Sequence, residues 1–302
     1  MTLDRTPAKR RSRVGAAPSN WLLAPALVFF GVFAIGPLLG VLVLSFMQWD
    51  GLGTPQWTGG ENWVSVLENP VSRQAMVLTV QLTLLSYVVQ FPLSLLLGVF
   101  MAGRQRYREF LSVLYFLPML FSAAAIGIAF KALLDPNFGL SRAFDAALLR
   151  QDWLGNGSLA FYVVVFVISW SFIPFHSLLY QAGVRQIPQS MYEAATIDGA
   201  GTVRQFFSIT LPQLKYTIVT SSTLMLVGSL TYFDLVFALT GGGPGTATRI
   251  LPLDMYLTGF RSNQMGEASV LAVILVAVGL TLALGLQRLT GAEKMESQAE
   301  GA

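Results

Sequence analysis

Residues 191–215 read MYEAATIDGAGTVRQFFSITLPQLK, and this stretch is the polar exception in an apolar chain. It holds Glu193, Asp198, Arg204 and Lys215, whereas only 12% of the 302 residues are charged and 54% are hydrophobic. Soluble domains average about 25% charged residues. Half that charge, together with long apolar runs, is typical of an integral membrane protein. The polar segment therefore needs a reason of its own.

Six apolar runs are long enough to cross a bilayer core of about 30 Å, which takes about 20 helical residues. They are Leu22–Met47, Ala75–Ala102, Phe110–Leu134, Leu159–Gly183, Ile218–Leu239 and Ala268–Leu286. The first run is too long for a signal-peptide core and no A-x-A site follows it, so we expect it to be retained. The sequence predicts an all-α integral membrane protein with six transmembrane helices.

The basic residues predict how these helices are oriented, because Lys and Arg favour the cytoplasmic side. With a cytoplasmic N-terminus, 13 of the 19 basic residues fall on that side and six on the other. The cytoplasmic set is Arg5, Lys9, Arg10, Arg11, Arg13, Arg104, Arg106, Arg108, Arg185, Arg204, Lys215, Arg288 and Lys294; the other set is Arg73, Lys131, Arg142, Arg150, Arg249 and Arg261. Both termini and the polar segment are therefore predicted to be cytoplasmic.

The polar segment is predicted to form two short helices joined by a glycine turn. Ser190 is a suitable N-cap, and Glu193 three residues later would complete a capping box. Gly199 can adopt the left-handed conformation that ends a helix. Thr202 and Gln205 would form a second capping box. Helical periodicity alone leaves open whether this hairpin lies on the membrane surface or docks into a protein groove. Surface helices are usually rich in Lys and Arg, whereas this one carries Glu193 and Asp198, which favours docking.

The stretch EAATIDGAGTVRQFFSITLP resembles the EAA loop, EAAxxDGAxxxxxFxxIxLP, of permease subunits of bacterial ABC importers. The matching positions are Glu193, Ala194, Ala195, Asp198, Gly199, Ala200, Phe206, Ile209, Leu211 and Pro212. In that family the loop is a coupling helix seated in a cleft of the cytoplasmic ATPase. The resemblance therefore implies ATPase coupling by Glu193, Ala194, Ala195, Asp198, Gly199, Arg204 and Phe206. Tyr216 departs from the pattern, since many relatives have a second proline near this position.

Several further segments resemble the carbohydrate-uptake class of these permeases. They are WDGLG and GGENWVSVLENP in the first outer loop, LYFLP at Leu114–Pro118, WSFIPF at Trp170–Phe175, and FDLVFALTGGGPGTAT at Phe233–Thr248 with GEASVLAVIL after it. Lys131 and Arg142 stand where relatives more often have uncharged residues, so we expect the second outer loop to be specialised. The resemblance implies the type I transmembrane fold of ABC importers in the bacterial inner membrane, surrounded by lipid. It also implies a solute such as a sugar, an oligosaccharide or a polyol derivative like glycerol phosphate.

The same resemblance implies the partners and the division of the chain. The partners are a second, different permease, two ATPase subunits that bind ATP and Mg²⁺, and an extracytoplasmic solute-binding protein. The expected divisions are a basic cytoplasmic tail (1–20), a first transmembrane helix with its outer loop (21–72), the permease domain (73–288) and a disordered cytoplasmic tail (289–302). Nothing in the sequence suggests nucleic-acid binding.

The chain lacks the residues for chemistry of its own. A phosphate-binding loop of the form G-x-x-x-x-G-K-[ST] is missing from the sequence. The dense glycine cluster Gly241–Gly245 lacks a following Lys-Ser or Lys-Thr pair, which favours a hinge or turn over a phosphate nest. A single histidine and no cysteine also disfavour a hydrolase dyad or a metal site. The sequence thus predicts a transport subunit with no catalytic residues and no cofactor.

Polar residues at membrane depth are costly, at about 2.5–3.5 kcal/mol for an Asp at a helix centre, so each invites a reason. The candidates for the solute pathway are Gln81, Gln90, Trp170, Tyr232 and Asp234. Each has a structural alternative that the sequence leaves open: binding to a neighbouring helix for the glutamines, packing for the aromatic residues, and burial as the partner of another helix for Asp234. His176, just beyond Pro174, is expected to satisfy a carbonyl that the proline leaves free.

Two rival functions follow from the same membrane fold. Midplane carboxylates and two matching halves would favour a secondary transporter driven by an ion gradient. The sequence has few such carboxylates and no evident internal repeat. A membrane enzyme would need a nucleophile and base, which the composition disfavours. We therefore favour the permease subunit of an ATP-driven importer, which forms half of the translocation pathway.

Overall fold

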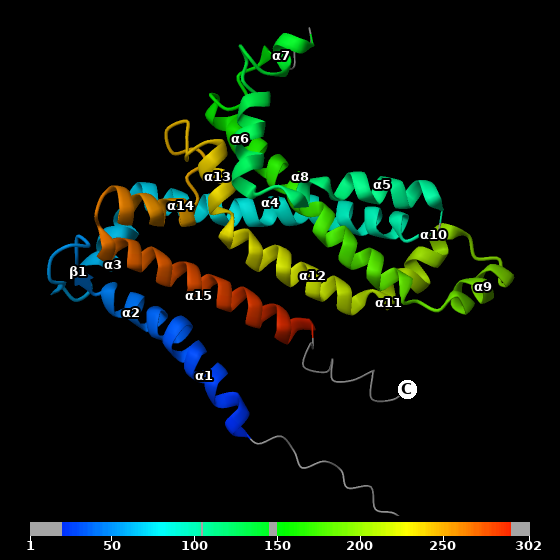
Figure 1. The fold of residues 1–302 in the computed structure, drawn as a ribbon, viewed down its shortest axis with the longest axis horizontal. Helices are drawn as coiled ribbons and strands as arrows, with labels where there is room; N and C mark the ends of the chain where they lie inside the picture. The colour runs from blue at the N-terminus through cyan, green and yellow to red at the C-terminus, as the bar shows by residue number, and fades with distance from the viewer. Residues whose placement is uncertain (1–19, 104, 145–149, 291–302) are drawn as a thin grey trace, which may run out of the picture.

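The computed structural model describes residues 20–103, 105–144 and 150–290, and this part of the chain is almost entirely helical (Figure 1). The predicted tails, over residues 1–19 and 291–302, lie outside the described residues. Most helices run along the long axis of the molecule. Strands β1 (Met47–Gln48) and β2 (Gln56–Trp57) and helices α3 (Glu61–Glu68) and α14 (Leu251–Tyr256) lie at one end, called the loop end here. Helices α9 (Gln189–Ile197) and α10 (Thr202–Gln205) lie at the other end, called the hairpin end (Figure 1).

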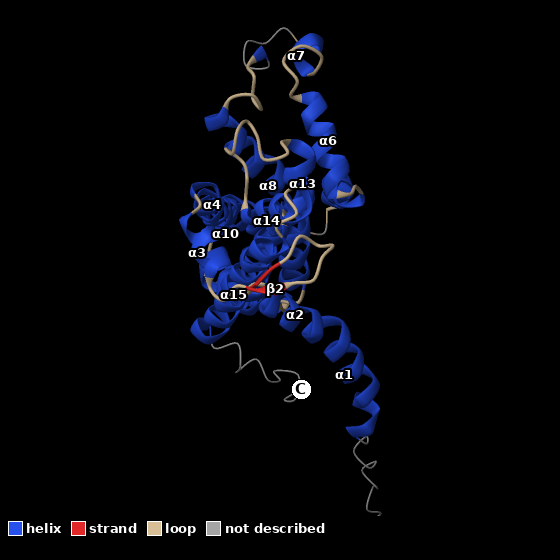
Figure 2. Cartoon of the chain, turned by 90° about the vertical axis from the view of Figure 1, so that its left-hand side faces the viewer, coloured by secondary structure: helices blue, strands red, loops and turns tan. Residues whose placement is uncertain are grey.

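The first apolar run forms a helix that projects away from the other helices (Figures 1 and 2). It consists of a 3₁₀ turn Asn20–Leu23, α1 Ala24–Phe30, a π-helical turn Gly31–Ile35 and α2 Gly36–Leu44. Pro37 has no N–H to offer the carbonyl one turn earlier, and the Gly36 N–H donates to the Gly31 oxygen, which gives the wider turn. None of the residues of α1 and α2 is buried, so this helix lacks packing partners along most of its length.

The loop end is closed by a small hairpin and one short helix. β1 Met47–Gln48 pairs with β2 Gln56–Trp57 in antiparallel register, and α3 Glu61–Glu68 follows. The buried Asn62 side chain donates to the carbonyl oxygens of Ser45 and Met47, at 3.1 and 2.9 Å. In the turn, the backbone N–H groups of Gly53 and Leu52 donate to the Asp50 carboxylate and lower its pKa. These bonds fix the end of the first helix against the rest of the molecule.

Two long helices form the centre of the bundle. They are α4 Pro70–Met101 and α8 Gly157–Arg185, which pack against each other. A Cβ added at Gly98 would lie 2.6 Å from both the Ser177 carbonyl oxygen and the Tyr180 Cβ, so glycine permits this close approach. The largest buried cluster surrounds these helices and includes Leu82, Val164, Ile168, Leu235, Leu239 and Leu253.

Two of the predicted spans are bent rather than straight. The third run forms α5 Arg106–Phe116, a 3₁₀ turn Leu117–Leu120 and α6 Ala123–Leu133, with a bend of 98°. Pro118 lies in the turn, and the Ser122 hydroxyl caps the new helix by accepting from the Ala125 N–H. Helix α6 and the short α7 Leu140–Ala143 therefore stand out from the bundle (Figure 2).

The fifth run is also broken, with a bend of 50°. It forms α12 Lys215–Gly228, a 3₁₀ turn Ser229–Thr231 and α13 Phe233–Leu239. At the break, the Ser229 hydroxyl donates to the Leu226 oxygen and the Thr231 hydroxyl donates to the Gly228 oxygen. These side chains compete with the helical backbone for its carbonyl groups, which favours the break at this point.

The glycine cluster forms an anchored turn between α13 and α14 Leu251–Tyr256. Gly241, Gly242 and Gly245 all have positive φ, as the predicted turn requires. The Thr79 hydroxyl of α4 accepts from the Leu251 N–H at 2.7 Å. An ion pair of 2.7 Å joins the partly buried Arg249 to the buried Asp254. After a π-helical turn Leu257–Arg261, α15 Met265–Thr290 returns along the bundle.

The hairpin end holds α9 Gln189–Ile197, α10 Thr202–Gln205, a π-helical turn Phe206–Thr210 and α11 Leu211–Gln213. In all, the described residues contain four helices long and apolar enough to cross a membrane, or six if each bent pair is one span. These six segments correspond to the six apolar runs. The prediction of an all-α membrane fold is therefore confirmed, and the bends at the third and fifth runs refine it.

Candidate functional site

The hairpin reverses at Gly199, as the sequence predicts. Its φ is +74°, a conformation that favours glycine. The Gly199 N–H donates to the Thr196 oxygen at 3.0 Å, and the Ala200 N–H donates to the Ala195 oxygen at 2.8 Å. This pair of bonds is the Schellman motif, in which the left-handed residue follows the end of the helix. The reversal at Gly199 is thus stabilised by backbone hydrogen bonds.

The two predicted capping boxes do not form. Helix α9 begins at Gln189 after Pro188, so Ser190 lies inside the first turn and not at the N-cap. Glu193 is then not at the third helical position, where a capping box would need it. Pro188 fixes an extended backbone, with φ of −57° and ψ of 130°, and the helix starts directly after it. Helix α10 likewise begins at Thr202 after Gly201, without a side-chain cap.

Gln205 and Tyr192 hold the hairpin together and attach it to the bundle. The Gln205 amide donates to the Thr196 hydroxyl at 3.0 Å and to the Ala200 oxygen at 2.9 Å, so it crosses the hairpin. The Tyr192 and Thr210 hydroxyls bond at 2.9 Å. Phe206, which the resemblance assigns to ATPase coupling, packs against a buried cluster formed by Leu95, Tyr180 and Leu214. Phe206 therefore anchors the hairpin to α4, α8 and the start of α12.

The outer surface of the hairpin combines charged and apolar side chains. Of the residues predicted to couple, Glu193, Ala194, Asp198, Gly199 and Arg204 are exposed, and Ala195 is half-buried. Within the described part of the chain, the three charged side chains make no ion pair or hydrogen bond. Sequence reasoning missed three exposed apolar residues: Ile197 (87% exposed), Val203 (72%) and Phe207 (61%). Their only signal in the sequence is that large apolar residues recur inside a polar segment.

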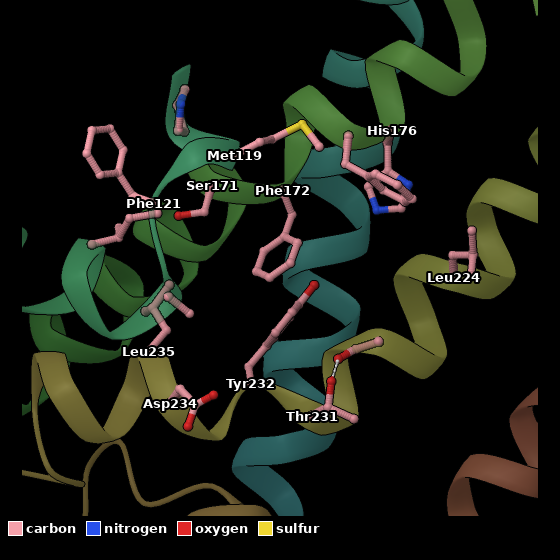
Figure 3. Close-up of a pocket in the computed structure, with 15 residues that line it drawn as sticks. Met119, Phe121, Ser171, Phe172, His176, Leu224, Thr231, Tyr232, Asp234 and Leu235 are labelled. Carbon is pink, nitrogen blue, oxygen red and sulfur yellow. Dashed lines mark hydrogen bonds between the residues drawn. The ribbon is translucent and has the colours of Figure 1, made fainter. Parts of the chain in front are cut away.

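A cavity of about 470 Å³ lies between α6, α8 and the α12–α13 break (Figure 3). Its walls are largely apolar, and four aromatic residues, Phe121, Phe172, Phe175 and Tyr232, are among the lining residues. The ring centroids of Phe172 and Tyr232 lie 4.8 Å apart, and the two rings form one wall. As candidates for the solute pathway, the sequence analysis singled out only Tyr232 and Asp234 from this lining, and it gave His176 a different role. The other members come from helices far apart in the chain, which a single sequence does not bring together.

The polar groups of the cavity differ in whether they have partners. The Ser171 hydroxyl donates to the Val167 oxygen, and the Thr231 hydroxyl donates to the Gly228 oxygen. The Asp234 carboxylate is exposed at the cavity and makes no hydrogen bond or ion pair within the described residues. Asp234 therefore offers a free acceptor at the cavity, and within the described residues it is not a buried partner of another helix.

The remaining pathway candidates do not line this cavity. Gln90 is buried on α4, and its contact with the Tyr232 hydroxyl does not have hydrogen-bond geometry, so both its amide atoms lack a partner. Gln81 is exposed on the opposite face of α4. Trp170 packs edge-to-face against Phe130, with ring centroids 5.1 Å apart. Of the five candidates, the structure thus brings together Tyr232 and Asp234 at the cavity, with Gln90 behind Tyr232.

His176 lines the cavity but does not have the role predicted for it. Its Nδ1 bonds to the Ser221 hydroxyl of α12 at 3.0 Å, rather than to a carbonyl freed by Pro174. The partner lies on another helix because His176 faces α12, on the side of α8 that packs there. This bond joins α8 to α12 beside the cavity.

Known proteins with similar sequences identify the family. Residues 94–292 match the family described as "Binding-protein-dependent transport system inner membrane component". The chain is 34% identical to "Probable ABC transporter permease protein YurN" of Bacillus subtilis (strain 168), over 87% of this chain and 92% of that protein. It is 30% identical to "Multiple sugar-binding transport system permease protein MsmF" of Streptococcus mutans serotype c, over 89% of this chain and 93% of the relative.

A solved structure has the same fold. It is a chain of the crystal structure of a bacterial alginate ABC transporter in complex with an alginate pentasaccharide-bound periplasmic protein. The TM-score is 0.79 at 21% identity, with 90% of this chain and 94% of that chain covered. The apolar helices, the hairpin and the match over residues 94–292 all lead to one assignment. The chain belongs to the ABC transporter permeases that form the inner-membrane components of binding-protein-dependent transport systems.

Proposed function

We propose that this permease imports a carbohydrate together with a second, different permease, and that its hairpin Gln189–Gln205 docks into a separate ATPase subunit. The observation that carries the coupling role is the exposure of Ile197 and Val203 on a folded hairpin beyond the bundle. Large apolar side chains grouped on an otherwise polar surface mark a protein-binding site. Glu193, Asp198 and Arg204 add charges free to pair with a partner.

The attachment of the hairpin supports a mechanism of alternating access. Phe206 and Tyr192 connect the hairpin to α8 and to the segment before α12. Closure of two ATPase subunits on ATP and Mg²⁺ would move the hairpin, and these contacts would carry the motion into α12. Because α12 leads directly to the break at Ser229–Thr231, the motion reaches the wall of the cavity.

The cavity favours an uncharged sugar as the solute. Aromatic faces such as Phe172 and Tyr232 suit the apolar faces of sugar rings, and the Asp234 carboxylate can accept from hydroxyl groups. None of the described lining residues is Lys or Arg, so a phosphorylated polyol would face a carboxylate without a compensating cation. The relative from Streptococcus mutans is named for multiple sugar-binding transport, and this name is consistent with a carbohydrate as the solute.

The proposed orientation puts the hairpin end in the cytoplasm and the loop end outside. The hairpin must meet a cytoplasmic ATPase, and the basic residues are biased toward the same side. Both termini are then cytoplasmic. The loop end, with β1, β2 and the glycine turn, faces an extracytoplasmic binding protein that delivers the solute.

A co-purification experiment tests the coupling role. The complex is extracted in mild detergent with the chain carrying Ile197→Asp and Val203→Asp, both on exposed side chains that are not part of the core. We expect the ATPase subunits to be lost while the partner permease is retained. Phe138→Asp, at a side chain that is 77% exposed on the loop before α7, is the matched control and should leave the complex intact.

Retention of the full ATPase complement by the double variant contradicts the docking role of the hairpin. Transport by the purified chain alone, driven by an ion gradient in liposomes, would instead support a secondary transporter. Sugar-dependent ATP hydrolysis by the reconstituted complex distinguishes these outcomes directly.

A further inference from the structure

The Ser221 hydroxyl of α12 lies beside two polar side chains of α8. It bonds to His176 Nδ1 at 3.0 Å, whereas its contact with the Tyr180 hydroxyl does not have hydrogen-bond geometry. His176 and Tyr180 are four residues apart, so they lie one turn apart on the same face of α8. One hydroxyl of α12 thus has two neighbours on α8, and only one of them is bonded to it.

All three side chains are buried. Ser221 and Tyr180 are 0% exposed and His176 is 3% exposed. Within the described residues the Tyr180 hydroxyl has no hydrogen-bond partner. An unsatisfied buried hydroxyl is unfavourable, and lipid chains offer it no partner either. A serine hydroxyl donates one bond and accepts others, so the position of α12, and not the capacity of Ser221, prevents a bond to Tyr180.

Helix α12 is attached to its neighbours through small hydroxyl side chains. Its buried residues are Ser221, Ser222 and Met225. Ser222 bonds to the Tyr87 hydroxyl of α4 at 3.1 Å. Two serines present little bulk that interlocks with α4 and α8, so they oppose a shift of α12 less than large side chains would. Shifts of about 1–2 Å between packed helices are common in conformational transitions.

Tyr180 is held against α4 and lies next to the attachment of the hairpin. A Cβ added at Gly98 of α4 would lie 2.6 Å from the Tyr180 Cβ, so α4 and α8 are in close contact here. The Tyr180 side chain belongs to the buried cluster with Leu95 and Leu214, against which Phe206 of the hairpin packs. Tyr180 therefore connects the base of the hairpin to the point where α12 meets α8.

We propose that Ser221 changes its hydrogen-bond partner during the transport cycle, from His176 in the present conformation to Tyr180 in the alternate one. A shift of α12 along α8 breaks one bond as it forms the other, and positions between the two satisfy neither neighbour. The exchange therefore gives α12 two discrete positions, as a two-state element requires. This inference rests on the proposed function in one respect, since the alternate conformation belongs to the cycle of the proposed importer.

Thermal unfolding of the intact complex in two nucleotide states tests the exchange. The midpoint is measured without nucleotide and after trapping with ATP, Mg²⁺ and vanadate. We expect Tyr180→Phe to lower the midpoint by about 2 °C in one state and His176→Leu to lower it in the other, because each removes a bond present only there. Ser221→Ala loses both bonds and should lower it in both states. Tyr162→Phe, at a side chain 62% exposed on α8, is the matched control and should lower neither.

ATP hydrolysis gives a second measurement. We expect Tyr180→Phe to reduce sugar-stimulated hydrolysis about threefold, as for one average interhelical hydrogen bond, with the amount of bound ATPase subunit unchanged. Tyr162→Phe should keep full stimulation. If His176→Leu does not assemble, the comparison of Tyr180→Phe, expected to act in one state, with Ser221→Ala, expected to act in both, decides the proposal.

Three results overturn the exchange. They are a lower midpoint for Tyr180→Phe in both states, a lower midpoint in neither state, or a lower midpoint in the same state as His176→Leu. The first would show that the Tyr180 hydroxyl is satisfied throughout the cycle. If the unaltered complex responds to sugar and ATP while the variants give one of these results, only this inference fails. If the unaltered chain recovers no ATPase subunit, the proposed function fails with it.

Discussion

Gly199 decides the geometry of the hairpin through its backbone. A Cβ there would meet nothing within 4 Å, so the cost of Gly199→Val is the strain of a β-branched residue at φ of +74°. We expect about 1–3 kcal/mol of strain, which distorts the turn and abolishes solute-stimulated ATP hydrolysis while the chain still inserts into the membrane. The measurement is ATPase activity of the reconstituted complex together with the amount of bound ATPase subunit.

Gly201 provides the control for Gly199. It is two residues away, its Cβ would also meet nothing within 4 Å, and its φ of −68° and ψ of 167° suit a β-branched residue. Gly201→Val should therefore keep full stimulation. Equal loss in the two variants would show that bulk on the hairpin, and not the left-handed turn, is what matters.

Asp234 is the residue whose charge the proposed pathway uses. Asp234→Asn keeps the shape of the side chain, and no partner within the described residues is lost with the charge. We expect sugar transport by the complex to fall at least about tenfold, equivalent to about 1.4 kcal/mol, while assembly and basal ATP hydrolysis persist. Transport is measured as uptake of labelled sugar into proteoliposomes. Unchanged uptake would show that Asp234 is not part of the pathway. Loss of the assembled complex would show that its role is structural.

At the scale of the helix, the approach of α4 and α8 depends on Gly98. Any side chain at this position meets backbone and the base of Tyr180 at 2.6 Å, which no rotamer relieves. We expect Gly98→Ala to lower the free energy of unfolding by about 1–3 kcal/mol, as overpacking does in a close-packed core. Gly285→Ala on α15, where a Cβ meets nothing within 4 Å, should be neutral or stabilising by up to about 1 kcal/mol. Thermal unfolding in detergent compares the two, and equal midpoints contradict the role assigned to Gly98.

The positions of the membrane helices could be predicted from the sequence, but their bends could not. Hydropathy locates apolar segments because each must match the thickness of the bilayer. The 98° bend after Leu120 depends on whether Ser122 caps a new helix, and that choice is settled by contacts with α8 and α13. The predicted capping boxes failed for a similar reason, because more than one helix start was compatible with the local sequence. Ser190 and Thr202 have suitable chemistry, but Pro188 and Gly201 set the helix starts one or two residues earlier.

The hairpin and the cavity differ in how well sequence predicts them. All residues of the hairpin are close together in the sequence, so one motif predicts both its turn at Gly199 and its polar surface. The cavity is assembled from α6, α8, α12 and α13, so its aromatic lining emerges only when these helices pack. Asp234 and Tyr232 could be selected because polar groups at membrane depth are costly. Phe172 and Phe175 could not, since aromatic residues are common in any membrane helix.

For the whole molecule, the orientation in the membrane can be tested directly. The chain has no cysteine, so single cysteines placed at the exposed Ser65, Ser158 and Thr202 report their own accessibility. We expect an impermeant thiol reagent to label Ser65→Cys and Ser158→Cys in intact cells and to label Thr202→Cys only after the membrane is opened. The bias of basic residues toward the hairpin side is the physical reason. Labelling of Thr202→Cys from outside would reverse the proposed orientation.

The exposed side chains of Ile197, Val203 and Phe207 also bear on how the cell manages this subunit before assembly. In the proposed orientation, a newly made copy without its ATPase subunit exposes these apolar side chains to the cytosol, where chaperones and proteases recognise such features. Docking hides them. We therefore expect surplus copies of the permease to be degraded when the ATPase subunits are scarce. The abundance of the permease would then follow that of the ATPase without a dedicated regulator.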